Sequence, residues 1–159
     1  MTGVADPDLR AVMHRFPHGV AVVTVDTQGQ QVGLTVSSLI SLSIEPPLVG
    51  FAVARQAAIH ELLLEARAFA VSLLAEGQEG TAEHFARGEP PLNHWRGIDR
   101  VPDVEDPPLL AGAVGWIRAN IAWSTPAGTH TFVAGAVTWT EVGPGERALT
   151  RARGTWSAV

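Results

Sequence analysis

The sequence predicts a mainly β protein, folded as a closed antiparallel barrel with short helices inserted between its strands. Three observations lead to this fold class. Two long strand patterns, residues 113–124 and 131–142, follow one another across a short turn. A second hairpin pattern stands near the start of the chain, and short helical patterns separate the strands between the two hairpins. Because long hairpins imply antiparallel pairing, this order favours a barrel over a doubly wound parallel sheet.

Length and composition predict one folded domain over residues 1–159. The apolar content is 46% and the charged content 17%, which argues against disorder and allows a buried core. The net charge of −5 makes a nucleic-acid surface unexpected, because phosphate binding needs clustered cations. All eleven basic residues are arginine, so an anion site would have to use arginine, hydroxyls or backbone amides.

The sequence also limits where the protein works and which chemistry it can use. Without cysteine it can form neither disulfides nor thiolate metal sites. No apolar run reaches the length of a membrane span, and the N-terminal segment does not resemble a signal peptide. We therefore expect a cytoplasmic protein with no membrane partner.

The first predicted element is a short amphipathic helix over residues 6–14. Asp6 is a suitable N-cap, and Pro7 occupies the first helical position. Phe16 and Pro17 end this helix. A β-branched run at 19–25 and a second strand at 31–37 then form the early hairpin.

Within the second strand, residues 33–38 read Gly-Leu-Thr-Val-Ser-Ser. Leu34 and Val36 should face one side of the strand, and Thr35 and Ser37 the other. Hydroxyls beside backbone amides suit a flat ligand rich in hydrogen-bond acceptors. The same alternation is also common on the polar face of antiparallel sheets, so both interpretations stay open from these residues alone.

The middle of the chain alternates strands and helices. A short strand at 41–44 and a buried apolar strand at 48–54 flank a Pro-Pro pair. Residues 57–66 predict a helix of about three turns, 69–74 a strand, and 78–87 another helix.

The last third of the chain begins with an irregular stretch. Residues 89–108 predict a long loop that carries Trp95. The long late hairpin follows, with its turn at residues 125–128. The tail at 148–156 is weakly strand-like.

Several catalytic classes find no support in the sequence. The six histidines show neither the HExxH pattern nor ligand spacing, so no metal site is expected. The nucleophile elbow of hydrolases, the dinucleotide fingerprint and the P-loop are absent as well. His130, between two threonines at the mouth of the late hairpin, could reach a ligand or could be an ordinary surface histidine.

Seven segments along the chain match one known pattern in the same order. They are Phe-Pro-His-Gly-Val-Ala-Val-Val-Thr at 16–24, residues 33–38, Ser-Ile-Glu-Pro-Pro-Leu-Val at 43–49, Phe-Ala-Val-Ser-Leu-Leu at 69–74 with Gln78 and Phe85, Pro-Leu-Leu-Ala-Gly-Ala at 108–113 with Trp116, Gly-Thr-His-Thr at 128–131, and Arg-Gly-Thr-Trp at 153–156. On these segments the chain resembles the flavin reductase family, FMN-binding split-barrel proteins that serve as reductase components of two-component monooxygenases.

The resemblance implies a six-stranded antiparallel FMN-binding split barrel with short flanking α-helices. It also implies a homodimer with FMN, or FAD, near the subunit interface. The implied reaction is hydride transfer from NADH or NADPH to the flavin, and a flavin-dependent monooxygenase is the implied partner. The flavin carries the chemistry, while the protein orients the ring and leaves one face open.

The resemblance also assigns the flavin contacts. The backbone amides and hydroxyls of a continuous segment would bind the isoalloxazine ring; its residues are Thr35, Val36, Ser37 and Ser38. Ala54 would let the flavin tail lie against its strand, and Arg55 would bind the phosphate. Gln56 and Ala58 stand where family members place phosphate-binding hydroxyls, so backbone N–H groups at the start of the next helix would have to help.

For the hydride donor, the resemblance places His130 at the nicotinamide side of the ring as the catalytic residue. Arg153 and Trp156 from the tail would close over the site. Thr129 replaces the aspartate that precedes this histidine in the family. Two other interpretations remain: a flavin-binding carrier or accessory domain without turnover, and an interaction module of the same fold that binds no ligand.

Overall fold

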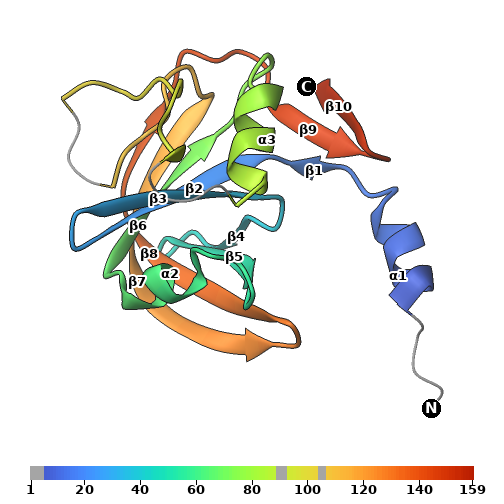
Figure 1. Cartoon of the computed structure of the whole chain (residues 1–159), viewed down its shortest axis with the longest axis horizontal. Helices are drawn as coiled ribbons and strands as arrows, with labels where there is room; N and C mark the ends of the chain where they lie inside the picture. The colour runs from blue at the N-terminus through green and yellow to red at the C-terminus, as the bar shows by residue number, and fades with distance from the viewer. Residues whose placement is uncertain (1–5, 89–92, 104–106) are drawn as a thin grey trace.

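The structure is a computed structural model, and it describes residues 6–88, 93–103 and 107–159 (Figure 1). The helices are α1 (Asp6–Met13), α2 (His60–Glu65) and α3 (Glu79–Ala86). The strands are β1 (His18–Gly19), β2 (Ala21–Thr27), β3 (Gln30–Val36), β4 (Ile40–Ser43), β5 (Leu48–Ala54), β6 (Ala68–Leu73), β7 (Gly115–Ala127), β8 (His130–Val142), β9 (Leu149–Ala152) and β10 (Thr155–Ala158).

The main sheet has seven antiparallel strands in the order β3-β2-β6-β7-β8-β5-β4. The six strands expected from the resemblance are therefore one too few, because β4 adds a seventh strand beside β5. The barrel is not closed either: β3 approaches β5, but the two strands do not pair. The irregular register of β4 between Ser41 and Ser43 marks this edge of the open sheet.

The tail forms two strands rather than one weak strand. β9 and β10 make a hairpin, and β1 pairs with β9 to complete a separate three-stranded sheet. Arg153 and Gly154 form its turn with φ of +53° and +73°. This left-handed backbone gives a tight two-residue connection, which explains why the strand pattern looks broken in the sequence.

The core between the strands is built around two phenylalanines. Phe51 and Phe69 are fully buried, and their rings meet edge to face at 5.1 Å. A Cβ atom on Gly135 would lie 2.4 Å from the Phe69 ring, so the glycine makes room for that ring. The apolar run of β2 is buried throughout, as its β-branched residues predict.

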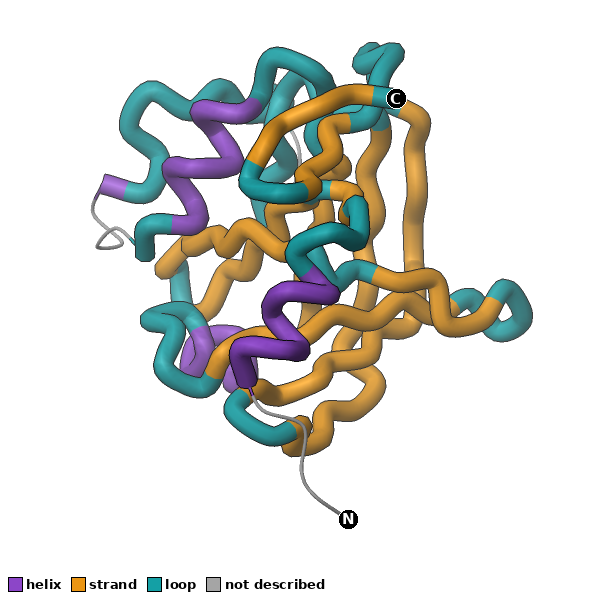
Figure 2. Tube along the Cα trace, turned by 90° about the vertical axis from the view of Figure 1, so that its right-hand side faces the viewer, coloured by secondary structure: helices purple, strands orange, loops and turns teal. Residues whose placement is uncertain are grey.

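A second core lies between the sheet and α3. Phe85 is fully buried there, and a Cβ atom on Gly33 would approach its ring to 2.7 Å. The side view in Figure 2 shows the helices outside the strands. The absent side chain at Gly33 therefore makes room for the Phe85 ring of α3.

Several predicted boundaries shift. The helix expected over 57–66 begins only at His60, because the preceding residues form turns with Ala57 N–H bonded to Ala54 O and His60 N–H to Ala57 O. The late hairpin is longer than expected, so its turn is Gly128–Thr129 instead of 125–128. Of the expected loop at 89–108, residues 89–92 and 104–106 lie outside the described residues. Trp95 packs on the sheet, with Nε1 donating to Gln31 O at 2.8 Å.

None of the described helices has the length and apolar character that a membrane crossing requires.

Candidate functional site

The end of β5 and the start of β8 bring two predicted site residues together. Ala54 and His130 face each other in the β5–β8 ladder, and the Arg55 N–H donates to Thr129 O at 3.1 Å. Arg55 and His130, far apart in the sequence, are therefore neighbours at one end of the sheet. Both are exposed, which leaves their side chains able to meet a ligand.

Gln56 and Ala58 lie in the turn that joins β5 to α2, and both are exposed. Because α2 begins after this turn, the stretch is not the helix start that the sequence predicts. The N–H groups of Arg55 and Ala57 are already bonded to backbone carbonyls. An anion at this turn would therefore depend on the Arg55 guanidinium and on the other amides of the turn.

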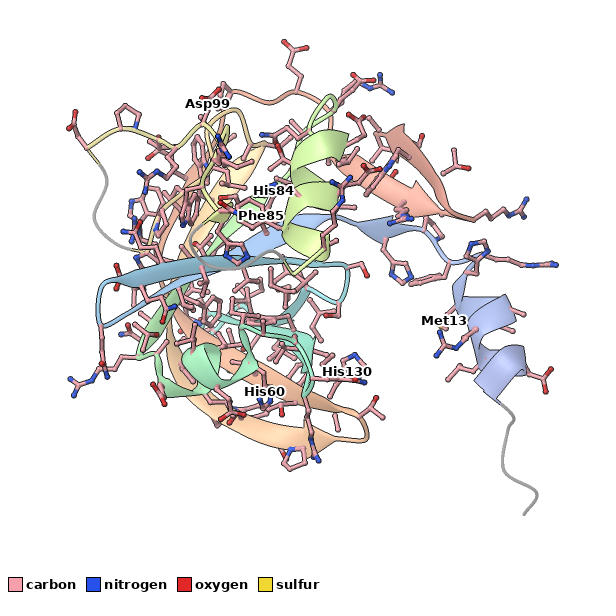
Figure 3. The ribbon with its side chains drawn as sticks, viewed as in Figure 1. Met13, His60, His84, Phe85, Asp99 and His130 are labelled. Atoms are coloured by element: carbon pink, nitrogen blue, oxygen red, sulfur yellow. The ribbon has the colours of Figure 1, made fainter. Side chains whose placement is uncertain are left out.

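His130 has a defined local partner. Its Nδ1 lies 3.0 Å from the Thr129 hydroxyl oxygen. If the hydroxyl donates to Nδ1, the ring carries its proton on Nε2, which then points a donor away from the turn. Thr129 thus orients the imidazole by a neutral hydrogen bond, in the position where an aspartate would do so by charge. Figure 3 shows His130 and His60 together on one side of β3, with His84 and Phe85 on the other.

The four residues of the segment Thr35–Ser38 differ in their burial and in their hydrogen-bond partners. The Thr35 hydroxyl donates to Ala82 O in α3 at 2.7 Å, and Val36 is buried in the core. The Ser38 hydroxyl accepts from the Ala52 N–H at 2.9 Å and donates to Ala52 O at 3.3 Å. Both hydroxyls therefore hold the fold together.

Ser37 differs from these neighbours because its side chain is exposed. It follows the last residue of β3 that pairs with β2, Val36. The backbone from residue 37 to 39 is thus outside the β2–β3 ladder, at the point where Ser38 ties it to β5. This edge offers one hydroxyl and backbone amides to a ligand.

The two tail residues, Arg153 and Trp156, contact different parts of the chain. Trp156 is half-buried against the second core; its Nε1 lies 3.4 Å from the Glu83 carboxylate, and Arg151 lies 4.6 Å over its ring. Glu83 follows Ala82, whose carbonyl oxygen accepts from the Thr35 hydroxyl. Helix α3 therefore contacts both Trp156 and Thr35. Arg153 lies at the tip of the β9–β10 turn, where its N–H donates to His14 O at 2.7 Å.

The predicted site residues that are exposed at the surface of the chain include Ser37, Arg55, Gln56, Ala58 and His130. A depression of about 950 Å³ lies elsewhere, lined by Asp26 to Gly29, Glu65 to Ala68 and Pro107. It contains none of the predicted cofactor-binding residues. Its volume would suit a ligand, but the exposed Ser37, Arg55 and His130 lie outside it, so we favour the surface between the end of β3 and the end of β5.

No group of three histidine, aspartate or glutamate side chains in residues 6–88, 93–103 and 107–159 gathers as metal ligands would.

Sequence reasoning missed the buried pair His60 and Thr131. His60 is 6% exposed, and its Nε2 lies 2.9 Å from the Thr131 hydroxyl oxygen. Their contact joins α2 to β8 across a large sequence separation, so no local pattern announces it.

Comparison with known proteins gives a consistent result. The family model described as flavin reductase like domain matches residues 13–157. An NADH:FMN oxidoreductase of Rhodococcus qingshengii is 37% identical over 137 residues, which cover 86% of this chain and 71% of that protein. The reductase component of 4-hydroxyphenylacetate 3-monooxygenase from Thermus thermophilus is 37% identical over 134 residues, covering 84% of this chain and 83% of that protein.

A solved structure matches over almost the whole chain. It is an NADH:FAD oxidoreductase of Streptomyces globisporus in complex with NAD and FAD fragments. The two chains share 34% sequence identity at a TM-score of 0.87, with 98% of this chain and 96% of that chain covered.

Proposed function

The chain belongs to the flavin reductase-like family, and we propose that it is an NAD(P)H-dependent flavin reductase acting on FMN or FAD. A single observation carries the proposal. The fold places the exposed Ser37 edge, the Arg55 cation and His130 around the same end of β5. A flavin needs donors for its ring, a cation for its phosphate and an open face for the nicotinamide, and these three features supply them.

The residues present fit this cofactor. The Ser37 hydroxyl and the amides beyond β3 would bind the polar edge of the ring. Ala54 and Ala58 have short side chains that leave room for the tail, and Arg55 would hold the phosphate. When bound, the flavin would accept a hydride from NADH or NADPH, leaving NAD(P)⁺ and reduced flavin.

His130 would act on the nicotinamide side of the ring. Its Nδ1 is engaged by Thr129, so the Nε2 end is the part that faces a second ligand. Its role is to hold the hydride donor in place, because hydride transfer can proceed from positioning alone. Trp156 and Arg153 would approach from the tail.

We also propose a homodimer. An apolar patch on the outer face of the sheet consists of Leu42, Phe132 and Trp123. Leu42 and Phe132 both flank Gly50, and the Phe132 and Trp123 rings lie 5.8 Å apart. Leu42 and Trp123 are 38% and 48% exposed, as interface residues are before association. Phe132 pairs with Ala52, the residue bound by Ser38, so a second subunit on this patch would border the flavin edge.

The reduced flavin would then serve a monooxygenase. The similarity to the reductase component of 4-hydroxyphenylacetate 3-monooxygenase supports this partner class. We extend the proposal to a single domain over residues 1–159 that works in the cytoplasm, where nicotinamide nucleotides supply the hydride.

The function is tested by anaerobic mixing of the protein with FMN and either NADH or NADPH. We expect loss of the visible flavin absorbance together with oxidation of the nucleotide, at a rate well above that without protein. If bound FMN stays oxidised with both nucleotides, the carrier alternative is correct. If the protein neither takes up colour nor quenches FMN fluorescence, it is a module without a flavin ligand.

A further inference from the structure

We propose that His60 is a positioning residue that clamps the phosphate-binding turn of this site onto β8 through the Thr131 hydroxyl, an inference that rests on the proposed function. The turn in question comprises residues 55–59. It carries Arg55, Gln56 and Ala58, the residues expected around the flavin phosphate.

Two contacts close this turn onto the same short segment of β8. At its start, the Arg55 N–H donates to Thr129 O at 3.1 Å. At its end, His60 Nε2 lies 2.9 Å from the Thr131 hydroxyl oxygen. The segment that carries His130 therefore lies between the two fastening points, so the turn and His130 are held as one unit.

The environment of His60 favours this role over that of an incidental surface contact. Its side chain is 8% exposed, and the Thr131 residue is 7% exposed, so water competes little for their hydrogen bond. Along β8, His130 and Thr131 point to opposite faces, as successive strand residues do. The buried Thr131 thus holds this part of β8 to α2 on one face of the strand. The exposed His130 lies on the opposite face, toward the proposed ligand.

Glu61 supplies the second contact of the ring. Its carboxylate oxygen lies 3.1 Å from His60 Nδ1, and its side chain is 83% exposed. With the proton on Nδ1 donated to Glu61, Nε2 is free to accept from the Thr131 O–H. One tautomer therefore satisfies both ends of the imidazole and orients it toward β8.

Besides these contacts with β8, the turn is held by its own short backbone bonds and by Ile59, which is buried in the core. Ala57 N–H donates to Ala54 O, and His60 N–H donates to Ala57 O. The α2 helix that follows has six residues, and its N-cap Ile59 makes no side-chain cap bond. The start of the turn is held to β8 by the Arg55–Thr129 bond and by the pairing of Ala54 with His130, whereas the His60–Thr131 bond joins its end to β8.

The test compares FMN with riboflavin, which has the same ring but no phosphate. Thr131→Val removes the hydroxyl at nearly constant volume, and Thr131→Ser keeps it. We expect Thr131→Val to weaken FMN binding about tenfold, or about 1.4 kcal/mol, while riboflavin binding changes by less than about twofold. Thr131→Ser should retain the FMN preference of the wild-type protein.

A matched control variant is available on the other side of α2. The Thr27 hydroxyl donates to Leu62 O at 2.9 Å and so tethers the same helix to β2. Thr27→Val should lower the melting temperature and leave the ratio of FMN to riboflavin affinity unchanged. His60→Leu should reproduce the loss seen for Thr131→Val; where it fails to fold, Thr131→Val decides.

Amide hydrogen exchange gives a readout that needs no flavin. Exchange in residues 55–59 should accelerate in Thr131→Val and stay at the wild-type rate in Thr27→Val. An unchanged FMN to riboflavin ratio together with unchanged exchange in Thr131→Val would overturn the clamp. A wild-type protein that binds neither flavin would refute the proposed function, and the exchange data would still decide whether His60 holds the turn.

Discussion

Replacing Ser38 by alanine should damage the fold, whereas the same change at Ser37 should damage flavin binding. The Ser38 hydroxyl both accepts from Ala52 N–H and donates to Ala52 O, which ties the end of β3 to β5. The Ser37 side chain is exposed at the proposed ring-binding edge. The two adjacent serines therefore separate a structural hydroxyl from a ligand-binding one.

The size of each effect follows from these contacts. Ser38→Ala leaves the partly buried Ala52 N–H without its acceptor, which costs about 1–2 kcal/mol. For a chain of this length that corresponds to a fall in melting temperature of about 2–8 °C. Ser37→Ala should change the stability by less than about 0.5 kcal/mol, as surface substitutions usually do. The lost hydrogen bond to the ring should weaken FMN binding about threefold to tenfold.

Two measurements on the same preparations decide the matter. Thermal unfolding without flavin gives the stability, and quenching of FMN fluorescence gives the affinity. If Ser38→Ala melts like the wild-type protein while Ser37→Ala binds FMN normally, the division of roles between the two serines is wrong.

Four further substitutions test other parts of the structure. Arg55→Ala should weaken FMN binding about threefold to tenfold and leave riboflavin binding unchanged. An equal loss of affinity for both flavins would show that Arg55 does not bind the phosphate. Leu42→Glu should yield monomers in light scattering, and a persistent dimer would place the interface elsewhere. Gly135→Ala should destabilise the protein by about 1–3 kcal/mol because its Cβ would meet the Phe69 ring at 2.4 Å. Gly80 in α3 has open space around it, so Gly80→Ala should stabilise the protein by about 0.5–1 kcal/mol. Denaturant unfolding checks both glycines, and similar values for the two would contradict the packing argument.

Local patterns predicted the strands well where burial dictates the sequence. The apolar run of β5 was placed at its observed bounds, and β2 and β6 within about two residues, because short runs of apolar residues leave a clear signal. The helix at α2 was placed too early. In place of its first turn the chain forms a local backbone turn with an Ala57–Ala54 bond, and His60 is bonded to β8, which no helical period can reveal.

The number of strands and the closure of the sheet depend on pairing, which the sequence does not state. β4 was predicted as a strand, but its place beside β5 makes the sheet seven-stranded and open. The tail forms a hairpin because Arg153 and Gly154 adopt a left-handed backbone conformation. The local sequence does not predict this conformation, which accompanies the long-range pairing of β9 with β1.

The candidate site was predictable as a set of residues and less so as a set of roles. The resemblance selected Arg55 and His130, which the fold makes neighbours. It could not show that Thr35 and Ser38 use their hydroxyls on Ala82 and Ala52. Such side-chain bonds depend on which backbone carbonyl lies opposite, and that is fixed by long-range packing.

The most direct test of the account is a crystal structure of the protein with FMN. We predict the isoalloxazine ring against the Ser37 edge, the phosphate at Arg55 and His130 beside the open face of the ring. FMN bound in the depression lined by Asp26 to Gly29 and Glu65 to Ala68 would contradict the account.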